Sequence, residues 1–433
     1  MSGSKNIVLS IEKQSIKETI QLTGSKSESN RALIMQALSD GKVQVVNLSK
    51  AADTVTLSNI LEESGKSKFK IQHPELSTEN LELKTNNSQL VDVGPAGTAM
   101  RFLTAFFAVQ PGELILTGSE RMQQRPIGIL VDALRSLGAK IDYAAKEGFP
   151  PLKISGPLSQ NTSVISVPGN ISSQYISALL LIAPKFPLGL ELVIEDELTS
   201  RPYVEMTLAM LEQGGIRHEW NNQTIAIANQ EFSDSVIHVE PDWSAASYWY
   251  AIAALSAEAE IFLPGLNGYS LQGDSRITEI MANFGITSQF KDGGVHLQKE
   301  SKKLERRIFD FKDCPDLAQT VIVCCAALGH DATFTGLETL KIKETDRIKA
   351  LQTELEKIGV KLIEKNLTCK LDCSGLHFPD HVIISTYEDH RMAMAFAPLA
   401  LKVKTLEIED AEVVGKSYPG FWTDLEKAGF IVK

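Results

Sequence analysis

The feature of this sequence that most limits its fold is an internal repeat. Six segments share one pattern, a small or polar turn followed by a helix that is apolar on nearly every face for about three turns. They are GSKSESNRALIMQAL, GPAGTAMRFLTAFFA, PGNISSQYISALLLIA, EPDWSAASYWYAIAAL, KDCPDLAQTVIVCCAAL and TYEDHRMAMAFAPLAL. Anchored on Arg31, Arg101, Tyr175, Tyr248, Thr320 and Arg391, they follow one another at intervals of 70, 74, 73, 72 and 71 residues. One α/β unit repeated six times therefore accounts for the whole chain.

A second set of helices repeats at the same interval and is amphipathic, as Leu130, Leu134 and Leu137 illustrate. Runs such as VISV, LELVIE, AEIFLP and HVIIST predict strands between the helices. We expect the apolar helices inside each unit and the amphipathic helices and sheets outside. A chain of 433 residues favours two domains. The pattern predicts two globules of three units, with a boundary near Glu240 and Pro241.

The formal net charge of −11 argues against nucleic acid or an anionic membrane as a partner, because both need a basic surface. No apolar stretch is long enough to span a bilayer, and residues 1–12 do not resemble a signal peptide. The five cysteines all follow residue 313. We therefore expect reduced thiols and a cytoplasmic protein.

The starts of the apolar helices carry the chemistry. Helix N-termini attract anions, and cations gather at or near them. These cations are Lys26, Arg31, Arg101, Arg125, Arg201, Lys343, Arg347, Arg391 and Lys416. A single such cation is usually a solvated surface charge, but Arg101 and Arg391 each precede apolar helical sequence and need a partner there. Together they predict a site for small, multiply charged anions.

Seven of these segments also carry a family resemblance. GSKSESNRAL, AGTAMR, RMQQRPIG, SSQYISALL, KETDR, YEDHRMAM and Gly415-Lys416-Ser417 occur in the order seen in EPSP synthases. The sequence resembles this family from about residue 22 to its end. The resemblance implies an α/β fold of two domains, each with three βαβαββ repeats, arranged as the inside-out α/β barrel of enolpyruvyl transferases. The domains would be residues 23–240 and residues 1–22 with 241–433, with the active site in the cleft between them.

The implied reaction transfers the enolpyruvyl group of phosphoenolpyruvate to the 5-hydroxyl of shikimate 3-phosphate and releases phosphate. By motif position, the phosphoenolpyruvate ligands would be Lys26, Gly97, Arg125, Gln174, Lys343, Arg347, Arg391 and Lys416. The shikimate 3-phosphate ligands would be Lys26, Ser27, Arg31, Ser172, Ser173, Gln174, Ser200, Asp316, Thr339 and Lys343. The catalytic residues would be Asp316, Glu344 and Lys26. The resemblance implies a monomer that uses no metal or organic cofactor.

Simpler roles exist for the two carboxylates: Asp316 as a helix N-cap and Glu344 as a first-turn carboxylate. Two positions depart from the family pattern, Phe102 in place of proline and Thr339 in place of asparagine. Cys369 and Cys373 lie four residues apart, too few ligands for a metal site. The resemblance also implies inhibition by glyphosate in competition with phosphoenolpyruvate. Gly97, whose missing Cβ lets a ligand approach the backbone, should discriminate between the two.

Two other functions are consistent with the repeat. The related enolpyruvyl transferase that acts on UDP-N-acetylglucosamine uses a cysteine in the loop that corresponds to TGSERMQQRPIG, and this loop has none. A catalytically silent anion-binding protein of the same fold is disfavoured because every acid–base position is occupied. Turnover distinguishes it from an enzyme.

Overall fold

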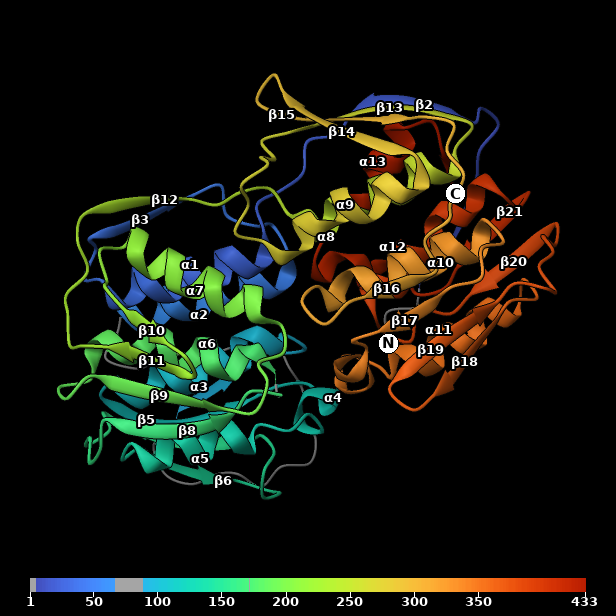
Figure 1. The fold of residues 1–433 in the computed structure, drawn as a ribbon. Coiled ribbons are helices and arrows are strands. Elements are labelled where there is room, and N and C mark those ends of the chain that lie inside the picture. Colours follow the sequence, from blue (N-terminus) through green and yellow to red (C-terminus); the bar gives the residue numbers. More distant parts are fainter. Residues whose placement is uncertain (1–4, 67–88, 171) are drawn as a thin grey trace. The chain divides into compact units, whose positions relative to one another are not determined.

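The computed structural model describes residues 5–66, 89–170 and 172–433 and divides the chain into two compact units (Figure 1). Unit 1 consists of Met1–Ser25 and Glu240–Lys433, and unit 2 of Lys26–Val239. Unit 2 thus begins at Lys26 rather than at residue 23 and ends one residue before 240. The two connecting segments pair within unit 1, because the Ser25 N–H donates to the Glu240 carbonyl at 2.7 Å and Gly24 bridges Pro241.

Unit 2 contains the first three predicted apolar helices, which contact one another: α1 (Lys26–Leu38), α3 (Gly97–Val109) and α6 (Ser173–Ile182). Its other helices are α2 (Ala52–Lys66), α4 (Glu120–Gln123), α5 (Gly128–Ser136) and α7 (Arg201–Gln213). One sheet has the order β4 (Gln89–Asp92), β5 (Gly112–Thr117), β7 (Leu152–Gly156), β6 (Lys140–Tyr143). Another has the order β10 (Glu219–Asn221), β11 (Thr224–Ile227), β9 (Leu190–Glu195), β8 (Val164–Pro168). In the first repeat, β12 (Ser235–His238) pairs in parallel with β3 (Val43–Val46), while residues 67–88 lie outside the described residues.

Unit 1 contains the other three apolar helices, α8 (Trp243–Leu255), α10 (Ala318–Ala327) and α12 (His390–Phe396). Its outer helices are α9 (Ile277–Met281), α11 (Arg347–Glu356) and α13 (Phe421–Lys427). One sheet has the order β14 (Ile286–Lys291), β15 (Gly294–Lys299), β13 (Glu258–Pro264), β2 (Ser15–Thr19). The second has the order β16 (Ile308–Asp310), β17 (Thr333–Thr335), β19 (Thr368–Asp372), β18 (Lys361–Lys365). The third has the order β20 (His381–Ile384), β21 (Thr405–Ile408), β1 (Ile7–Ser10), β22 (Ile431–Val432).

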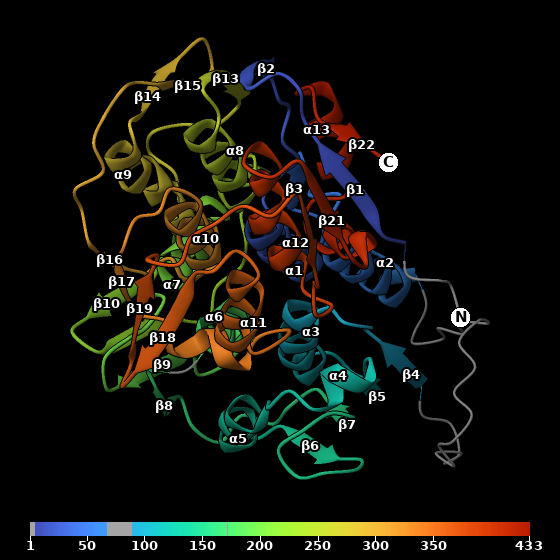
Figure 2. The same cartoon turned by 90° about the vertical axis from the view of Figure 1, so that its right-hand side faces the viewer.

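Each four-stranded sheet is mixed in the same way. One edge strand of each sheet is parallel to its neighbour, as β8 is to β9 and β20 is to β21, and an apolar helix precedes the second strand of that pair in the sequence. The remaining strands are antiparallel. Strands distant in sequence complete two of these sheets: β2 pairs with β13, and β1 pairs with β21, Ile7 opposite Ile408. Figure 2 shows β1 beside β21 and β22.

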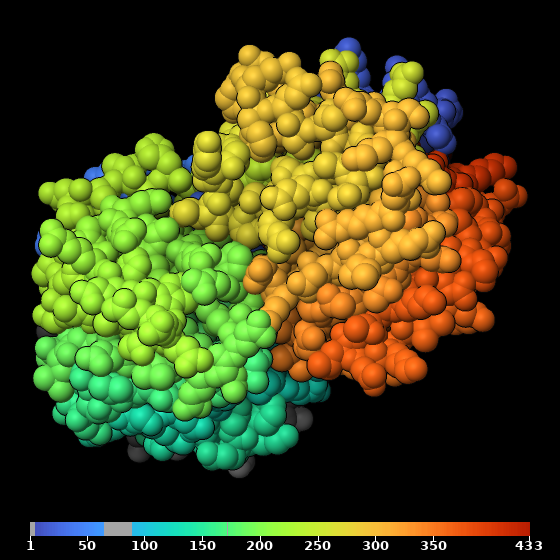
Figure 3. Space-filling view, in the orientation of Figure 1, coloured from blue at the N-terminus to red at the C-terminus, as the bar shows by residue number. Residues whose placement is uncertain are grey.

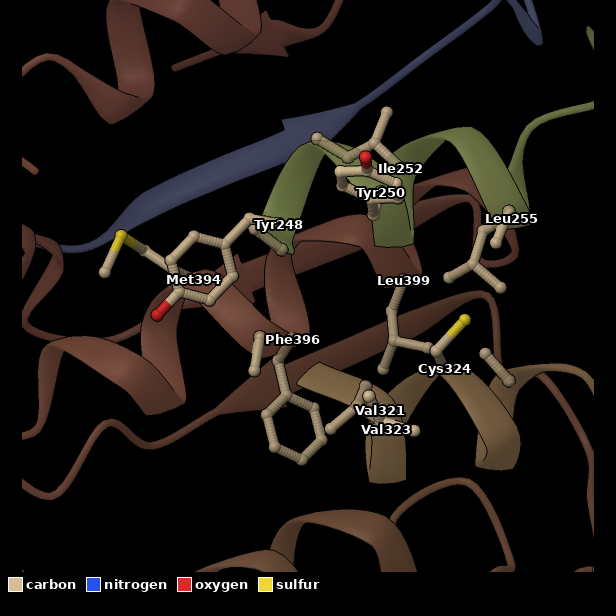
Figure 4. Packing of buried hydrophobic residues seen from close by; sticks show 14 of the residues in the cluster. Tyr248, Tyr250, Ile252, Leu255, Val321, Val323, Cys324, Met394, Phe396 and Leu399 are labelled. Carbon is tan, nitrogen blue, oxygen red and sulfur yellow. The ribbon is translucent and has the colours of Figure 1, made fainter. Parts of the chain in front are cut away.

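The apolar helices form the core of each unit, as predicted. α8 is apolar on every face, so it is stable only when other elements surround it, and Trp243 and Trp249 have no exposed surface. Figure 4 shows side chains of α8, α10 and α12 meeting, among them Tyr248, Val321 and Phe396. On the face of unit 1 seen in Figure 3, the yellow and orange segments that carry β13–β15 and β16–β19 make most of the surface. In the part of the chain that the structure describes, no helix combines the length and apolar character needed to cross a bilayer.

Candidate active site

In unit 1, six predicted site residues come together from four separate segments. Asp316 lies in the 3-10 helix η4 (Pro315–Leu317), and Lys343 and Glu344 lie in the loop before α11. Arg347 begins α11 and Arg391 is the second residue of α12. Lys416 ends the 3-10 helix η7 (Ala411–Lys416). Four cations and two carboxylates from distant parts of the sequence are thereby joined in one cluster.

Arg347 is the centre of this cluster and is 1% exposed. Its Nε donates to Asp389 Oδ2 at 2.7 Å, its Nη2 to Glu344 Oε2 at 3.0 Å, and its Nη1 to Asp316 Oδ1 at 3.2 Å. Burial by itself would lower the pKa of Arg347, but the Asp389, Glu344 and Asp316 carboxylates outweigh that effect and raise the pKa. The guanidinium therefore remains charged and holds three carboxylates in place.

Arg391 and Lys343 complete the cluster around Asp316. Arg391 Nη2 donates to Asp316 Oδ2 at 2.8 Å, and Lys343 Nζ lies 3.8 Å from Asp316 Oδ1. Burial lowers the pKa of Lys343 although Asp316 opposes the shift. Lys416 Nζ lies 3.1 Å from Glu344 Oε1.

The simpler roles considered for Asp316 and Glu344 are wrong. The N-cap position of η4 is Cys314, and Asp316 directs its carboxylate to the cations. α11 begins at Arg347 with Asp346 as its N-cap, so Glu344 precedes the helix instead of lying in its first turn.

In unit 2, the predicted ligands Gly97 and Arg125 are in direct contact. A Cβ placed on Gly97, the first residue of α3, would lie 2.5 Å from Arg125 Nη1. Arg101 fastens this region, because its guanidinium donates to the carbonyls of Gly97 at 3.0 Å and Pro126 at 3.1 Å. The Tyr175 hydroxyl also donates to Pro126 at 2.5 Å. The sequence predicted a partner for Arg101, and the partners are these two backbone carbonyls, of Gly97 and Pro126.

The remaining predicted residues of unit 2 lie at other helix starts. Lys26 begins α1 with Ser27 beside it, and its Nζ lies 3.5 Å from Asp53 Oδ2. Ser172 is the N-cap of α6, where it accepts from the Gln174 N–H, and Ser173 is the first residue of that helix.

Two further polar groups lie beside these helix starts. The Gln174 amide donates to Thr98 at 3.1 Å, which joins the starts of α6 and α3. Ser200 precedes α7 with a left-handed backbone (φ 54°) and is buried.

Arg31 differs from the other predicted ligands because protein oxygens already occupy most of its donors. It is 2% exposed and donates to Thr207 Oγ1, Ser27 O, Ser177 Oγ and Tyr203 O, at 2.7 to 3.1 Å. Burial lowers the pKa of Arg31 to about 10. The Phe102 ring, which departs from the family pattern, faces the Arg31 guanidinium at 5.5 Å. A guanidinium has five N–H groups, so one of them remains for a ligand.

Several residues of the unit 1 cluster were missed by the sequence analysis. Asp389 lies within YEDHRMAM, directly before His390 and Arg391, and that position was the available signal. Ser244 and Tyr248 on α8 accept hydrogen bonds from Arg391, and Asp274 accepts one from Ser244. These α8 positions lie in apolar sequence, which gave no indication of a site.

The Thr339 hydroxyl and the thiols of Cys369 and Cys373 are buried in unit 1. Thr339 lies in η5 (Glu338–Ile342), and its buried hydroxyl has no hydrogen-bond partner among the described residues. Cys369 and Cys373 are buried and carry free thiols. Within the described ranges, no group of three or more His, Cys, Asp or Glu side chains is arranged to hold a metal.

Comparisons with known proteins find relatives over almost the whole chain. The family model for EPSP synthase (3-phosphoshikimate 1-carboxyvinyltransferase) matches residues 11–425. A 3-phosphoshikimate 1-carboxyvinyltransferase of Bacteroides fragilis is 48% identical over 421 residues, covering 96% of this chain and 97% of the relative. The chain belongs to the EPSP synthase family. A relative of the same name from Paraburkholderia phytofirmans is 35% identical over 413 residues, covering 93% of this chain and 95% of its own length.

Solved structures show the fold of this EPSP synthase family member to be a mixed α/β fold. An EPSP synthase from Acinetobacter baumannii superposes with a TM-score of 0.75 at 20% identity, covering 99% of this chain and 100% of that one. The enolpyruvyl transferase NikO from Streptomyces tendae gives a TM-score of 0.71 at 14% identity, with 99% of both chains covered.

We expect Asp274 to make the stability of this EPSP synthase family member depend on pH. Burial raises its pKa to about 7 from 3.8, Asp316 adds to the rise, and Arg391 opposes it. The native state therefore binds the proton that the unfolded chain loses, and stability falls as pH rises from about 4 to about 7. The side chain of Asp274→Asn stays neutral. As pH rises through that window, the free energy of unfolding of the variant should therefore increase relative to that of the parent. Thermal unfolding of both proteins between about pH 4 and pH 8 tests this. A parent-to-variant difference that does not change with pH would refute it.

Proposed function

We propose that the protein transfers the enolpyruvyl group of phosphoenolpyruvate to the 5-hydroxyl of shikimate 3-phosphate. The hydroxyl gives its proton to a base as its oxygen bonds to C2 of phosphoenolpyruvate, while an acid adds a proton to C3. Loss of a proton from C3 and of phosphate from C2 then restores the double bond. The observation that carries the proposal is the cluster around Arg347, which gathers the cations and carboxylates of this chemistry in a chain that belongs to the EPSP synthase family.

Phosphoenolpyruvate is proposed to bind the cations of this cluster. Lys343, Arg347, Arg391 and Lys416 already face the carboxylates of Asp316, Glu344 and Asp389. Four positive and three negative groups leave only one formal positive charge, whereas phosphoenolpyruvate carries a phosphate and a carboxylate. Further cations are therefore required, and we propose Lys26 and Arg125 for this role, with Gly97 and Gln174 as further phosphoenolpyruvate ligands.

Shikimate 3-phosphate is proposed to bind mainly unit 2. Its ligands would be Lys26, Ser27, Arg31, Ser172, Ser173, Gln174 and Ser200, together with Asp316, Thr339 and Lys343 of unit 1. Hydroxyl and amide groups at helix starts suit the oxygens of a phosphate and a polyol ring. For Arg31, the remaining N–H group on Nη1 supports this assignment.

Asp316 and Glu344 are proposed as the groups that exchange protons, with Lys26 as a third. Each carboxylate contacts cations that hold it in a fixed orientation, as general acid–base catalysis requires. We also propose that each unit contains three βαβαββ repeats. The enzyme is proposed to act as a monomer.

A phosphate-release assay tests the function. Phosphoenolpyruvate and shikimate 3-phosphate are offered separately and together, and the products are identified by mass. We expect phosphate only when both are present, with a product that carries the enolpyruvyl group. Release that requires UDP-N-acetylglucosamine instead would favour the related transferase, although all five cysteines are buried. Binding of both substrates without turnover would identify a silent anion-binding protein.

Gly97→Ala is expected to weaken the binding of glyphosate more than the binding of phosphoenolpyruvate, by two separate effects. The first effect follows from the structure. The new methyl group would displace the Arg125 guanidinium and so weaken the binding of both glyphosate and phosphoenolpyruvate. The second is a direct clash with the longer inhibitor. Inhibition and the KM for phosphoenolpyruvate are measured in the parent, in Gly97→Ala and in Arg125→Lys. If Gly97→Ala changes both quantities by the same factor, the displacement of Arg125 explains everything and Gly97 does not discriminate.

A further inference from the structure

The loop between β20 and α12 contains two consecutive left-handed residues that are not glycine. Tyr387 has a φ of 55° and Glu388 a φ of 57°. Residues with a Cβ rarely adopt this backbone conformation, and two in succession persist only where surrounding contacts hold them. The loop leads directly to Asp389, the carboxylate that contacts Arg347.

Two contacts on α11 fasten this loop. Glu354, which has no exposed surface, accepts from the Tyr387 hydroxyl at 2.7 Å and from the Ser385 N–H at 3.1 Å. Seven residues earlier on the same helix, Arg347 donates to Asp389 at 2.7 Å. Residues seven apart lie on one face of a helix, so α11 holds the loop at both ends of the left-handed pair.

Asp389 contacts both arginines. Its Oδ2 accepts from Arg347 Nε, and its Oδ1 accepts from the backbone N–H of Arg391 at 2.9 Å, as the N-cap of α12. A relaxed loop would move Asp389, and with it the acceptor of the Arg347 guanidinium and the backbone of Arg391 at the start of α12.

We propose that Tyr387 and Glu354 are positioning residues, whose hydrogen bond holds the left-handed loop so that Asp389 aligns Arg347 and Arg391 for phosphoenolpyruvate. This inference rests on the proposed function, in which both arginines bind that substrate. Neither Tyr387 nor Glu354 contacts the substrate in this scheme. Their effect is transmitted through Asp389.

Tyr387→Phe removes only the hydroxyl and tests the inference. Loss of one hydrogen bond of ordinary strength should raise the KM for phosphoenolpyruvate by about fivefold and leave the KM for shikimate 3-phosphate within about twofold. Tyr250→Phe is the matched control, because it also loses a hydroxyl hydrogen bond in unit 1, to Ser288 at 2.8 Å. The control should leave both KM values unchanged. An unchanged KM for phosphoenolpyruvate in Tyr387→Phe would overturn the inference.

A second variant separates positioning from a general loss of stability. Asparagine tolerates the left-handed conformation better than glutamate does. Adding Glu388→Asn to Tyr387→Phe should therefore return the KM for phosphoenolpyruvate to within about twofold of the parent value. Failure of this rescue would contradict a role through the loop backbone. The parent enzyme is assayed first, so that absence of enolpyruvyl transfer in the parent counts against the proposed function and not against the loop.

Discussion

Glu344→Gln is expected to lower turnover by about 10²- to 10⁴-fold while the affinity for shikimate 3-phosphate stays within a factor of about three. The glutamine oxygen can still accept a hydrogen bond from Arg347 or Lys416, which hold Glu344 at 3.0 and 3.1 Å. The substitution therefore keeps the shape of the cluster and removes the group that exchanges a proton. The loss should appear in kcat, because we propose that shikimate 3-phosphate binds mainly to unit 2.

Steady-state kinetics and direct binding measurements check this expectation in the same preparation. Glu338→Gln is a suitable control, because Glu338 is an exposed carboxylate of η5 in the same region of the chain. Near-normal turnover in Glu344→Gln would remove Glu344 from the mechanism. A large loss of shikimate 3-phosphate affinity would assign it to binding.

Arg347→Met should destabilise unit 1 by about 3–5 kcal/mol, the typical cost of leaving buried charges without their partner. The substitution removes one cation from three carboxylates, and Asp389 among them has no exposed surface. Methionine fills a similar space but provides no donor, so the loss is electrostatic rather than a packing defect.

Urea unfolding followed by tryptophan fluorescence measures the effect, since Trp243, Trp249 and Trp422 all lie in unit 1. Arg276→Met is the matched control in unit 1: the Arg276 side chain is 38% exposed, and its pair with Asp313 at 3.7 Å should contribute less than about 1 kcal/mol. If the two variants unfold at the same urea concentration, the carboxylates have found other partners and Arg347 is not the centre of the cluster.

The helices were predictable because their signal is local. Apolar positions on every face of 243–255 and 318–327 indicate burial without reference to any other part of the chain. The cations of the site were also predictable, since they lie in recognisable segments. Their carboxylate partners were harder to predict. Whether Asp316 caps a helix or faces Arg391 depends on where a segment 75 residues later is placed.

Patterns within a single sequence could not predict which distant strands pair. Alternation predicts that residues 7–10 form a strand, but not that Ile7 lies opposite Ile408. The same limit applies to Ser244 and Asp274. Ser244 accepts from Arg391 and donates to Asp274, and these contacts follow only from the packing of α8 against α12.

The pairing of β1 with β21 also has a consequence for synthesis on the ribosome. A strand made among the first ten residues finds its neighbours only after residue 408 has been translated. Unit 2 is complete as soon as β12 has emerged and joined β3, so it can fold while most of unit 1 is still unmade. Throughout that interval β1 carries an unsatisfied strand edge, a template for pairing with other chains. Chains that stop before β21 should therefore be recognised by chaperones and proteases through β1 rather than through the segments made last.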